Sequence, residues 1–446
     1  MDAHSSRLSS GLAAIAAILF SASFSSYAAD PPVAWQGAVD IAAGRGEKGP
    51  WRQNDSRYDY VDDPAVALDD RGRMVVAWVE QARKDVLMQR FASGGQPVGK
   101  PVNVSRSPAT FSWLPRVAIA PDAQQNVFIL WQEIIFSGAS HGGEMFLARS
   151  DDGGASFSEP LNLSNSVGGD GKGRINKDVW HNGSYDIVAA PDGVVYAAWT
   201  EYDGPLWFSR STDGGKQFSR PQRIAGGGNA KPARGPSLAV GKGREVYLAW
   251  TTGEDDSADI HIARSDNGGE SFGSPVVVFQ GKGYSDAPKL AVDLAGTVHL
   301  VFAESAGGPF ERYRVLYARS SDGARSFEQP RDISAPLPAS SDSAAFPAIG
   351  LDGAGNMIVT WEMIAGRSQR PRGLGLVVSR DGGRSFTKPQ PVPGSADAAG
   401  GSNGSHQGLL MKKLAVNGTG TVALVNSSLK EGAHSRVWLL HGSLSR

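Results

Sequence analysis

The stretch from Pro64 to Trp78 reads P-A-V-A-L-D-D-R-G-R-M-V-V-A-W, and its pattern decides the fold. Two short apolar segments flank an Asp/Gly turn, which is typical of a β-hairpin. The same pattern returns five times and then once in a weaker form: Pro115–Trp131, Ile187–Trp199, Pro236–Trp250, Pro288–Phe302, Pro347–Trp361 and, more weakly, Lys413–Val425. The copies are spaced by roughly 50 to 70 residues, as expected for a repeat of one small sheet.

A second repeated sequence follows five of these hairpins. It begins with S-D-D-G-G-A-S-F at Ser150, and its other copies begin at Ser211, Ser265, Ser320 and Ser379. The short acid in the third position can accept N–H bonds from its own turn, and the glycines allow positive φ. We expect the closing phenylalanine to pack against the sheet below. Two copies depart mildly from the pattern, with Asn267 for Asp and Ala324 for Gly.

The two ends of the chain complement each other. A strand pattern without a preceding hairpin opens at Trp35–Ile41, while the last hairpin is followed only by Arg436–Leu444. Pairing these two segments removes two open sheet edges. The sequence therefore predicts an all-β fold, a β-propeller of four-stranded antiparallel blades closed by its N- and C-terminal strands. Seven blades fit the count of hairpins, with six as the alternative. The buried tryptophans ending the hairpins are expected to pack blade against blade.

The five turns resemble the Asp box, or BNR repeat, of sialidase-like β-propeller proteins. This resemblance implies that the turns lie on the face opposite a ligand site and carry no chemistry themselves. A true exo-sialidase also needs an arginine in an R-I-P phrase that opens the first blade. This chain has Asp62-Asp63-Pro64 there, and the closer phrase Arg234-Gly235-Pro236 opens the fourth repeat. We therefore do not expect an exo-sialidase.

Composition and the N-terminus limit the function classes. The formal net charge is −1, which gives no reason to expect a nucleic acid as partner, and the chain has no cysteine. Residues 1–28 combine Arg7, an apolar run from Leu12 to Phe20 and a small-residue stretch, as in a signal peptide. The run is too short to span a bilayer comfortably. We expect a secreted or periplasmic monomer without membrane insertion, with one propeller domain over residues 29–446.

The candidate site lies in long loops on the face opposite the five turns. These loops are predicted to connect successive blades or the second and third strands within a blade: 44–63, 133–144, 164–184, 304–314, 362–372 and 393–412. Aromatic, basic and acidic side chains together suit a polar, ring-shaped ligand such as a sugar. The predicted substrate-binding residues are Trp51, Arg52, Tyr58, Trp113, His141, Trp180, Arg312, Arg370 and His406. The loop that carries Arg370 also carries Arg367 and Arg372.

If the protein cleaves its ligand, the candidate catalytic residues are Arg174, Asp178, His181 and Tyr185. Histidine, tyrosine and arginine are the residue types that seven-bladed polysaccharide lyases use, and a glycoside hydrolase is equally open. No histidine spacing dictates a metal site, and we expect neither metal nor cofactor. The sequence favours carbohydrate recognition, and cleavage stays open. The alternative is a non-catalytic propeller that binds protein or assists envelope assembly.

Overall fold

The computed structural model describes Met1 and residues 31–445 except 51, 53–54, 107–110, 121–125, 135–142, 166–173, 176–179, 182–183, 202–203, 256, 282, 310, 367–369 and 404–411. For residues 111–114, 134, 143, 174–175 and 180–181 only the backbone is described. Residues from Pro32 onward form one compact unit. The predicted leader lies outside the described residues, apart from Met1.

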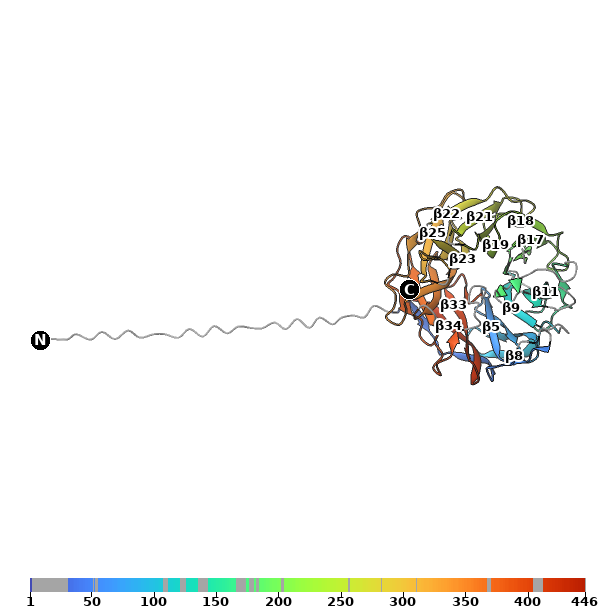
Figure 1. The fold of residues 1–446 in the computed structure, drawn as a ribbon, viewed down its shortest axis with the longest axis horizontal. Helices are drawn as coiled ribbons and strands as arrows, with labels where there is room; N and C mark the ends of the chain where they lie inside the picture. The colour runs from blue at the N-terminus through green and yellow to red at the C-terminus, as the bar shows by residue number, and fades with distance from the viewer. Residues whose placement is uncertain are drawn as a thin grey trace. The chain divides into compact units, whose positions relative to one another are not determined.

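Every regular element in the described ranges is a β-strand, and the strands form seven antiparallel blades around one axis (Figure 1). The first three blades comprise β5 (Val61–Leu68), β6 (Met74–Glu80), β7 (Asp85–Phe91) and β8 (Pro97–Asn103); β9 (Phe111–Ile119), β10 (Val127–Ile134), β11 (Gly143–Ser150) and β12 (Leu161–Asn162); and β15 (Tyr185–Ala189), β16 (Val195–Thr200), β17 (Leu206–Ser211) and β18 (Gln222–Ala225).

The next three blades repeat this order. They comprise β19 (Ala233–Val240), β20 (Val246–Thr252), β21 (Asp259–Ser265) and β22 (Val276–Phe279); β23 (Tyr284–Val292), β24 (Val298–Ser305), β25 (Arg314–Ser320) and β26 (Arg331–Asp332); and β27 (Ser343–Leu351), β28 (Met357–Ile364), β29 (Pro371–Ser379) and β30 (Gln390–Pro391). In each of these six blades the chain runs from the innermost strand outward.

The seventh blade joins the two ends of the chain, as predicted. It contains β32 (Leu414–Val416), β33 (Thr421–Lys430), β34 (His434–Leu444) and the N-terminal β1 (Val33–Trp35) and β2 (Val39–Gly44), with β31 (Ser402–Asn403) also paired to β33. Strand β34 pairs with both N-terminal strands, for example Val33 with Leu444 and Val39 with Leu439. The prediction of seven blades is confirmed, and the six-bladed alternative is excluded.

Apolar clusters fill the spaces between neighbouring blades. The buried tryptophans predicted to pack there, Trp78, Trp131, Trp199, Trp250 and Trp361, are at most 2% exposed. Each lies in a cluster of apolar side chains, and Trp131, for instance, joins residues of blades 1 and 2. The ring is therefore stabilised by repeated blade-to-blade burial of apolar surface.

The five predicted turns join the third and fourth strands of blades 2 to 6, and their hydrogen bonds are nearly the same in each copy. In the first, Ser150 Oγ accepts from Gly154 N at 2.8 Å and Asp152 Oδ1 accepts from Ser156 N at 2.9 Å. The closing phenylalanines, Phe157, Phe218, Phe272, Phe327 and Phe386, pack against the apolar clusters. This local chemistry explains why the turn recurs.

Arginines on the third strands tie some of these turns to the preceding blade. Arg210, Arg264 and Arg319 donate from Nη1 to the turn carbonyls of Gly268, Gly323 and Gly382, at 2.8 to 3.2 Å. The links run from blade 3 to 4, 4 to 5 and 5 to 6. The same hydrogen bond is thus used three times around the ring.

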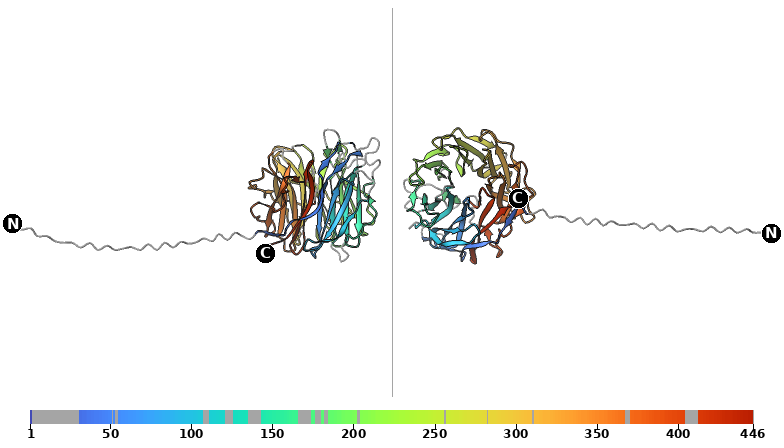
Figure 2. Two further views of the ribbon diagram at one scale, coloured as in Figure 1. Left: turned by 90° about the horizontal axis from the view of Figure 1, so that it is seen from below. Right: turned by 180° about the vertical axis from the view of Figure 1, so that it is seen from behind.

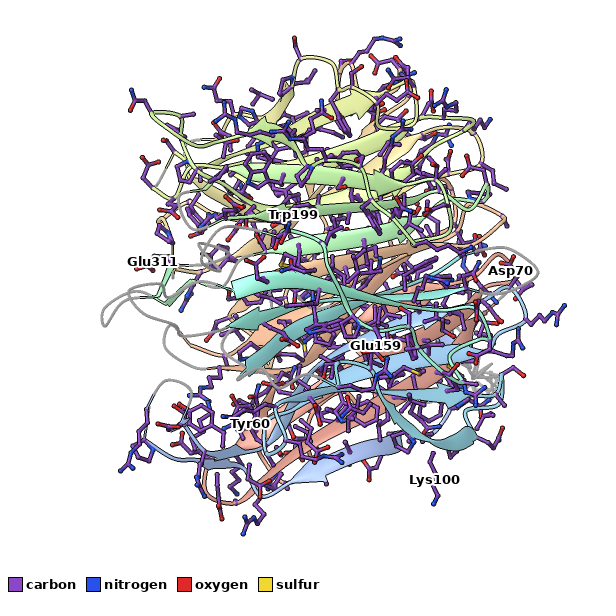
Figure 3. All side chains as sticks on the ribbon, turned by 90° about the vertical axis from the view of Figure 1, so that its right-hand side faces the viewer. Tyr60, Asp70, Lys100, Glu159, Trp199 and Glu311 are labelled. Atoms are coloured by element: carbon purple, nitrogen blue, oxygen red, sulfur yellow. The ribbon has the colours of Figure 1, made fainter. Side chains whose placement is uncertain are left out.

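The strands run between two faces of the ring, seen edge-on in Figure 2. We call the face with the inner hairpins and the five turns the turn face, and the opposite one the loop face. Figure 3 shows Glu311 at one edge, the loop face, with Tyr60 on the same side, and Asp70 near the other edge, the turn face. Two short hairpins belong to the loop-face connections: β3 (Glu47–Lys48) with β4 (Tyr58–Asp59), and β13 (Arg174–Ile175) with β14 (Trp180–His181).

Candidate functional site

The innermost strand of most blades is interrupted by a bulge, where the pairing register shifts. In four blades a residue with positive φ precedes a proline at this bulge: Asp63 (52°), Gly235 (60°), Ala287 (54°) and Phe346 (54°). This conformation suits glycine and is strained for the other three residue types. The bulge shifts the pairing register, and the residue after the proline then occupies an equivalent position in each of these blades.

These equivalent positions form a ring close to the axis. Each of these residues pairs with a residue near the end of the second strand of its blade. Arg116, for example, pairs with Leu130, directly before Trp131, and Lys289 pairs with Val301, directly before Phe302. From blade 1 to blade 7 the residues are Ala65, Arg116, Asp186, Ser237, Lys289, Ala348 and Lys413. Charged side chains are thus brought to the centre of the ring from four blades.

Two of these side chains bind the free backbone edge of the next blade. Asp186 Oδ2 accepts from Leu238 N at 2.9 Å, and Ser237 Oγ accepts from Leu290 N at 3.0 Å. An inner strand has no neighbour on its axial side, so its amide groups need such partners. Part of the polar ring is therefore structural.

A second buried polar group links blades 6, 7 and 1. Lys413, 4% exposed, forms an ion pair with Glu362, whose other oxygen accepts from Asn403 Nδ2 at 2.7 Å. Nearby Asp62, 1% exposed, accepts from Ser427 Oγ at 2.6 Å. Burial raises the pKa of the Asp62 carboxyl, and the Ser427 hydrogen bond opposes this shift. The acid in place of the sialidase arginine is thus held inside the ring.

The Arg234-Gly235-Pro236 phrase does not build an arginine site at the axis. The Arg234 guanidinium lies 4.8 Å from the Tyr284 ring centroid and 3.5 Å from Asp286. Asp286 in turn accepts from the hydroxyls of Thr251 and Tyr284, both at 3.2 Å. Arg234 is therefore held by its neighbouring blade.

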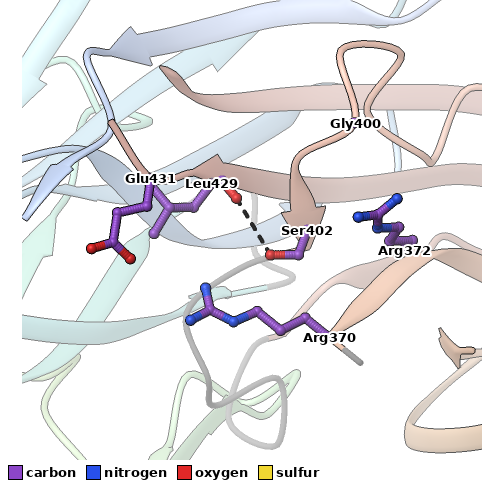
Figure 4. Close-up of a pocket in the computed structure, with 6 residues that line it drawn as sticks. All are labelled: Arg370, Arg372, Gly400, Ser402, Leu429 and Glu431. Atoms are coloured by element: carbon purple, nitrogen blue, oxygen red, sulfur yellow. Dashed lines mark hydrogen bonds between the residues drawn. The ribbon is translucent and has the colours of Figure 1, made fainter. Parts of the chain in front are cut away.

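A cavity of about 530 Å³ opens on the loop face between blades 6 and 7 (Figure 4). It is lined by Arg370, Arg372, Gly400, Ser402, Leu429 and Glu431. Arg370 directly precedes β29 and Arg372 lies within it, while Gly400 and Ser402 come from the connection before β32. Leu429 lies near the end of β33, and Glu431 directly follows that strand. Its volume lies in the range of small-molecule sites.

Asp397 orders the connection that carries Gly400 and Ser402. Its carboxylate accepts from His434 Nε2 at 2.7 Å, Ser428 Oγ at 2.9 Å and Gly401 N at 3.0 Å. Burial alone would raise its pKa, but these hydrogen bonds hold the pKa of Asp397 well below its usual range. The cavity wall is therefore built on a stable ionised group.

Positive charge dominates the cavity. Within the described residues, neither Arg370 nor Arg372 forms an ion pair or a side-chain hydrogen bond. Lys48, on the β3–β4 hairpin, lies 5.3 Å from the Tyr60 ring centroid. Burial lowers the pKa of Lys48, and the positive charge of Arg370 lowers it further. Among the described residues, the cavity thus presents two guanidinium groups with a third cation close by and one carboxylate, that of Glu431.

The structure tests the position of only some predicted site residues. Arg370 lines the cavity, whereas Arg52 and Arg312 are exposed and Tyr58 is half-buried. Tyr185 is 1% exposed beneath the Arg116 guanidinium, and burial raises its pKa well above the usual range. Trp51, His141, Asp178 and His406 lie outside the described residues. Only the backbone is described for Trp113, Arg174, Trp180 and His181, so the catalytic set stays a prediction.

Lys48, Glu431, Arg116 and Lys289 were not predicted as site residues. For the last two a signal exists in the sequence, because each directly follows a proline at the start of a repeat.

In the described residues no helix has the length and apolar character needed to cross a membrane. Nor do three or more His, Asp or Glu side chains of that part of the chain converge as a metal site would require.

No protein-family model matches this chain, and no curated protein matches it in sequence. Solved structures do resemble it. An ulvan lyase, a polysaccharide lyase bound to a GlcA(1-4)Rha3S saccharide, has a TM-score of 0.59 at 13% identity, covering 92% of this chain and 98% of that one. A Dyadobacter fermentans protein of unknown function has a TM-score of 0.55 at 12% identity, covering 93% and 100%.

An α-L-arabinofuranosidase from Fusarium graminearum is more distant, with a TM-score of 0.50 at 13% identity, covering 77% of this chain and 98% of that one. At these identities the likeness shows the fold alone. The propeller part of the predicted resemblance is therefore confirmed, while membership of the sialidase-like group stays a prediction.

Proposed function

We propose that this protein is exported and binds an anionic carbohydrate at the loop-face cavity of Arg370 and Arg372. The observation that carries the proposal is a cavity of ligand size with two guanidinium groups that have no carboxylate partner in the described residues. Guanidinium groups bind carboxylates and sulfates through paired, charge-assisted hydrogen bonds. A uronate or a sulfated sugar offers those groups on a polar ring.

The fold supports this assignment without deciding it. The ulvan lyase of the same architecture was solved with a saccharide containing GlcA and Rha3S. Both units of that saccharide match the chemistry that two free guanidinium groups would select. The match favours an acidic polymer over a neutral one as the ligand of the present cavity.

The test is a binding titration with polygalacturonate, a sulfated glucuronan and neutral arabinan. We expect the purified protein to bind the acidic polymers and to bind arabinan weakly. Arg370→Ala/Arg372→Ala should weaken acidic-polymer binding by at least about 100-fold, because two or more charge-assisted hydrogen bonds of about 1.5–3 kcal/mol each are lost and about 1.4 kcal/mol corresponds to a tenfold change in affinity. The matched control, Arg220→Ala/Lys242→Ala, removes two exposed cations from the turn face and should bind as the unchanged protein does.

Two results would contradict the proposal: equal binding of arabinan and the acidic polymers, or unchanged binding by the Arg370/Arg372 double variant. The same samples report on cleavage. β-Elimination moves the C5 proton of a uronate to a base and expels the C4 oxygen, leaving an ultraviolet-absorbing double bond, whereas hydrolysis releases reducing ends without that absorbance. With cleavage detected, loss of it in His181→Ala and Tyr185→Phe would support the predicted catalytic set.

A further inference from the structure

Three cationic side chains from distant parts of the chain lie at the inner strand of blade 3. The Arg116 guanidinium, from β9, lies 5.4 Å from the Tyr185 ring centroid. Lys412, which precedes β32, donates from Nζ to the carbonyl of Ile187 at 3.1 Å. Lys289, from β23, is close enough to Arg116 and Lys412 for their charges to lower its pKa. Blades 2, 5 and 7 thus direct positive charge toward one place on the axis.

Two nearby carboxylates, those of Asp186 and Asp286, are already engaged by other groups, and a third acid, Asp63, lies close enough to Arg116 for its charge to raise the arginine's pKa. The two oxygens of Asp186 accept from Ile187 N and Leu238 N, both at 2.9 Å, and Lys412 Nζ lies 3.8 Å away. Asp286 is occupied by Ala287 N, the hydroxyls described above and Arg234. In the described part of the chain, no carboxylate lies within ion-pair distance of Arg116 or Lys289.

Arg116 is 1% exposed, and among the residues that the structure describes its Nη1 and Nη2 atoms have no hydrogen-bond partner. The Tyr185 ring attracts the face of the guanidinium but accepts none of the N–H groups at its edge. Leaving such donors buried and unpaired costs free energy, more so for a charged group. A partner of negative charge would remove that cost.

Solvent can reach this place. The Lys412 side chain is 32% exposed, and Lys289 is also partly exposed, although both lie at the centre of the ring. An anion can therefore approach the two ammonium groups, and Arg116, held against the Tyr185 ring, is close enough to Lys289 for its charge to act there.

We propose that Arg116, Lys289 and Lys412 form an axial oxyanion site, separate from the loop-face cavity, for a sulfate, phosphate or carboxylate group. Arg116 offers two adjacent N–H donors that fit two oxygens of one anion, and the lysines add charge at its other side. The proposal does not rest on the proposed function. The oxyanion would be either a free ion or the acidic group of a sugar.

The experiment is a calorimetric titration of the purified protein with sulfate, and separately with glucuronate monosaccharide, in chloride buffer of constant ionic strength. We expect saturable binding of one ion per chain. Lys289→Met and Arg116→Lys should each weaken it at least about 10-fold, the second because lysine lacks the paired donors. Lys242→Met is the control for loss of one cation, and Arg370→Ala/Arg372→Ala should leave the axial site intact. Circular dichroism checks that each variant is folded.

Crystals soaked with selenate then locate the ion directly by its anomalous scattering. Selenate beside the Nη atoms of Arg116 supports the site, and saturable glucuronate binding without sulfate binding assigns it to a carboxylate. Absence of saturable binding for both probes would overturn it. So would sulfate binding that survives Lys289→Met and Arg116→Lys, or that disappears in the Arg370/Arg372 variant, because the ion would then lie elsewhere. Failure of polymer binding alone leaves this test unaffected.

Discussion

At the residue scale, the buried charges inside the ring depend on neighbouring side chains for their stability. Lys413 and Glu362 are almost fully buried and form an ion pair, with Asn403 and Asn426 completing their hydrogen bonds. Removing two charges from water costs free energy, and the attraction between the two side chains offsets that cost only while both are present. The two residues should therefore respond very differently to single and to double substitution.

We expect Lys413→Met to lower the free energy of unfolding by about 3–5 kcal/mol, because it leaves Glu362 charged and buried without a cation. Lys413→Met/Glu362→Gln removes both charges and keeps an oxygen for Asn403, so it should recover most of the loss. Urea denaturation of the three proteins measures the difference. Equal stability of the single and double variants would show that the pair is not coupled.

Lys289 gives the ring a dependence on alkaline pH. Burial, together with the charges of Arg116 and Lys412, lowers its pKa from 10.5 to about 8, while Asp186 and Asp286 oppose the shift. Between those two pH values the unfolded chain binds more protons than the folded one, so the free energy of unfolding rises with pH. Below pH 8 both states are protonated and the contribution is constant.

The prediction concerns the difference between the unchanged protein and Lys289→Met. In chloride buffer that difference should grow in favour of the unchanged protein as pH rises from about 8 to 10.5, since methionine does not titrate. Denaturant titrations across this range measure it, with Lys242→Met as an exposed control whose curve should run parallel to that of the unchanged protein. Parallel curves for Lys289→Met as well would place Lys289 in ordinary solvent.

At the element scale, the side chain in the third position of each of the five repeated turns accepts a backbone N–H bond from its own turn. Asp322 Oδ1 accepts from the backbone N–H groups of Arg325 and Ser326 at 3.0 Å and from Ser320 Oγ at 2.7 Å. Side-chain and backbone hydrogen bonds hold the pKa of Asp322 well below its usual range. The third turn shows that an amide can substitute, because Asn267 Oδ1 accepts in the same way.

Asp322→Ala should therefore lower the free energy of unfolding by about 1–3 kcal/mol, whereas Asp322→Asn should cost much less. The carboxylate contributes stability above the usual aspartate pKa, and this contribution is lost as pH falls through the lower pKa of the folded state. The free energy of unfolding of Asp322→Asn should therefore decrease less steeply in acid than that of the unchanged protein. Thermal unfolding at neutral and acid pH compares the variants. A loss in Asp322→Asn as large as in Asp322→Ala would mean that charge, rather than hydrogen-bond geometry, maintains the turn.

The strands and turns of each blade could be predicted from the sequence, whereas the contacts across the axis could not. Hairpins such as Pro64–Trp78 and the five turns are set by local pattern, so blade number, strand order and the packed tryptophans followed from the sequence. Arg370 could be assigned to the loop face for the same reason. The axial contacts could not, because Lys412 reaches Ile187 only through the curvature and closure of the whole ring. The repeated pattern along the chain predicts the blade in which a residue lies, but it does not predict which residue of another blade it contacts across the axis.

At the scale of the whole molecule, closure depends on pairing between segments some 400 residues apart, and the absence of cysteine allows a direct test. Ala34 and Ser443 are exposed, directly opposed residues on β1 and β34. Opposed residues of antiparallel strands have Cα atoms about 4.5–5.5 Å apart, within the range that a disulfide bridges.

Ala34→Cys/Ser443→Cys should cross-link on oxidation and raise the midpoint of thermal unfolding, because the bond closes a loop of nearly the whole chain and restricts the unfolded state. Reductant should return the midpoint to that of the unchanged protein, and each single cysteine variant should show no redox dependence. Mobility on a non-reducing gel confirms the bond. A cross-linked protein that unfolds at an unchanged midpoint would contradict this prediction, because the restriction of the unfolded chain would then be cancelled by strain that the bond introduces where β34 meets the N-terminal strands.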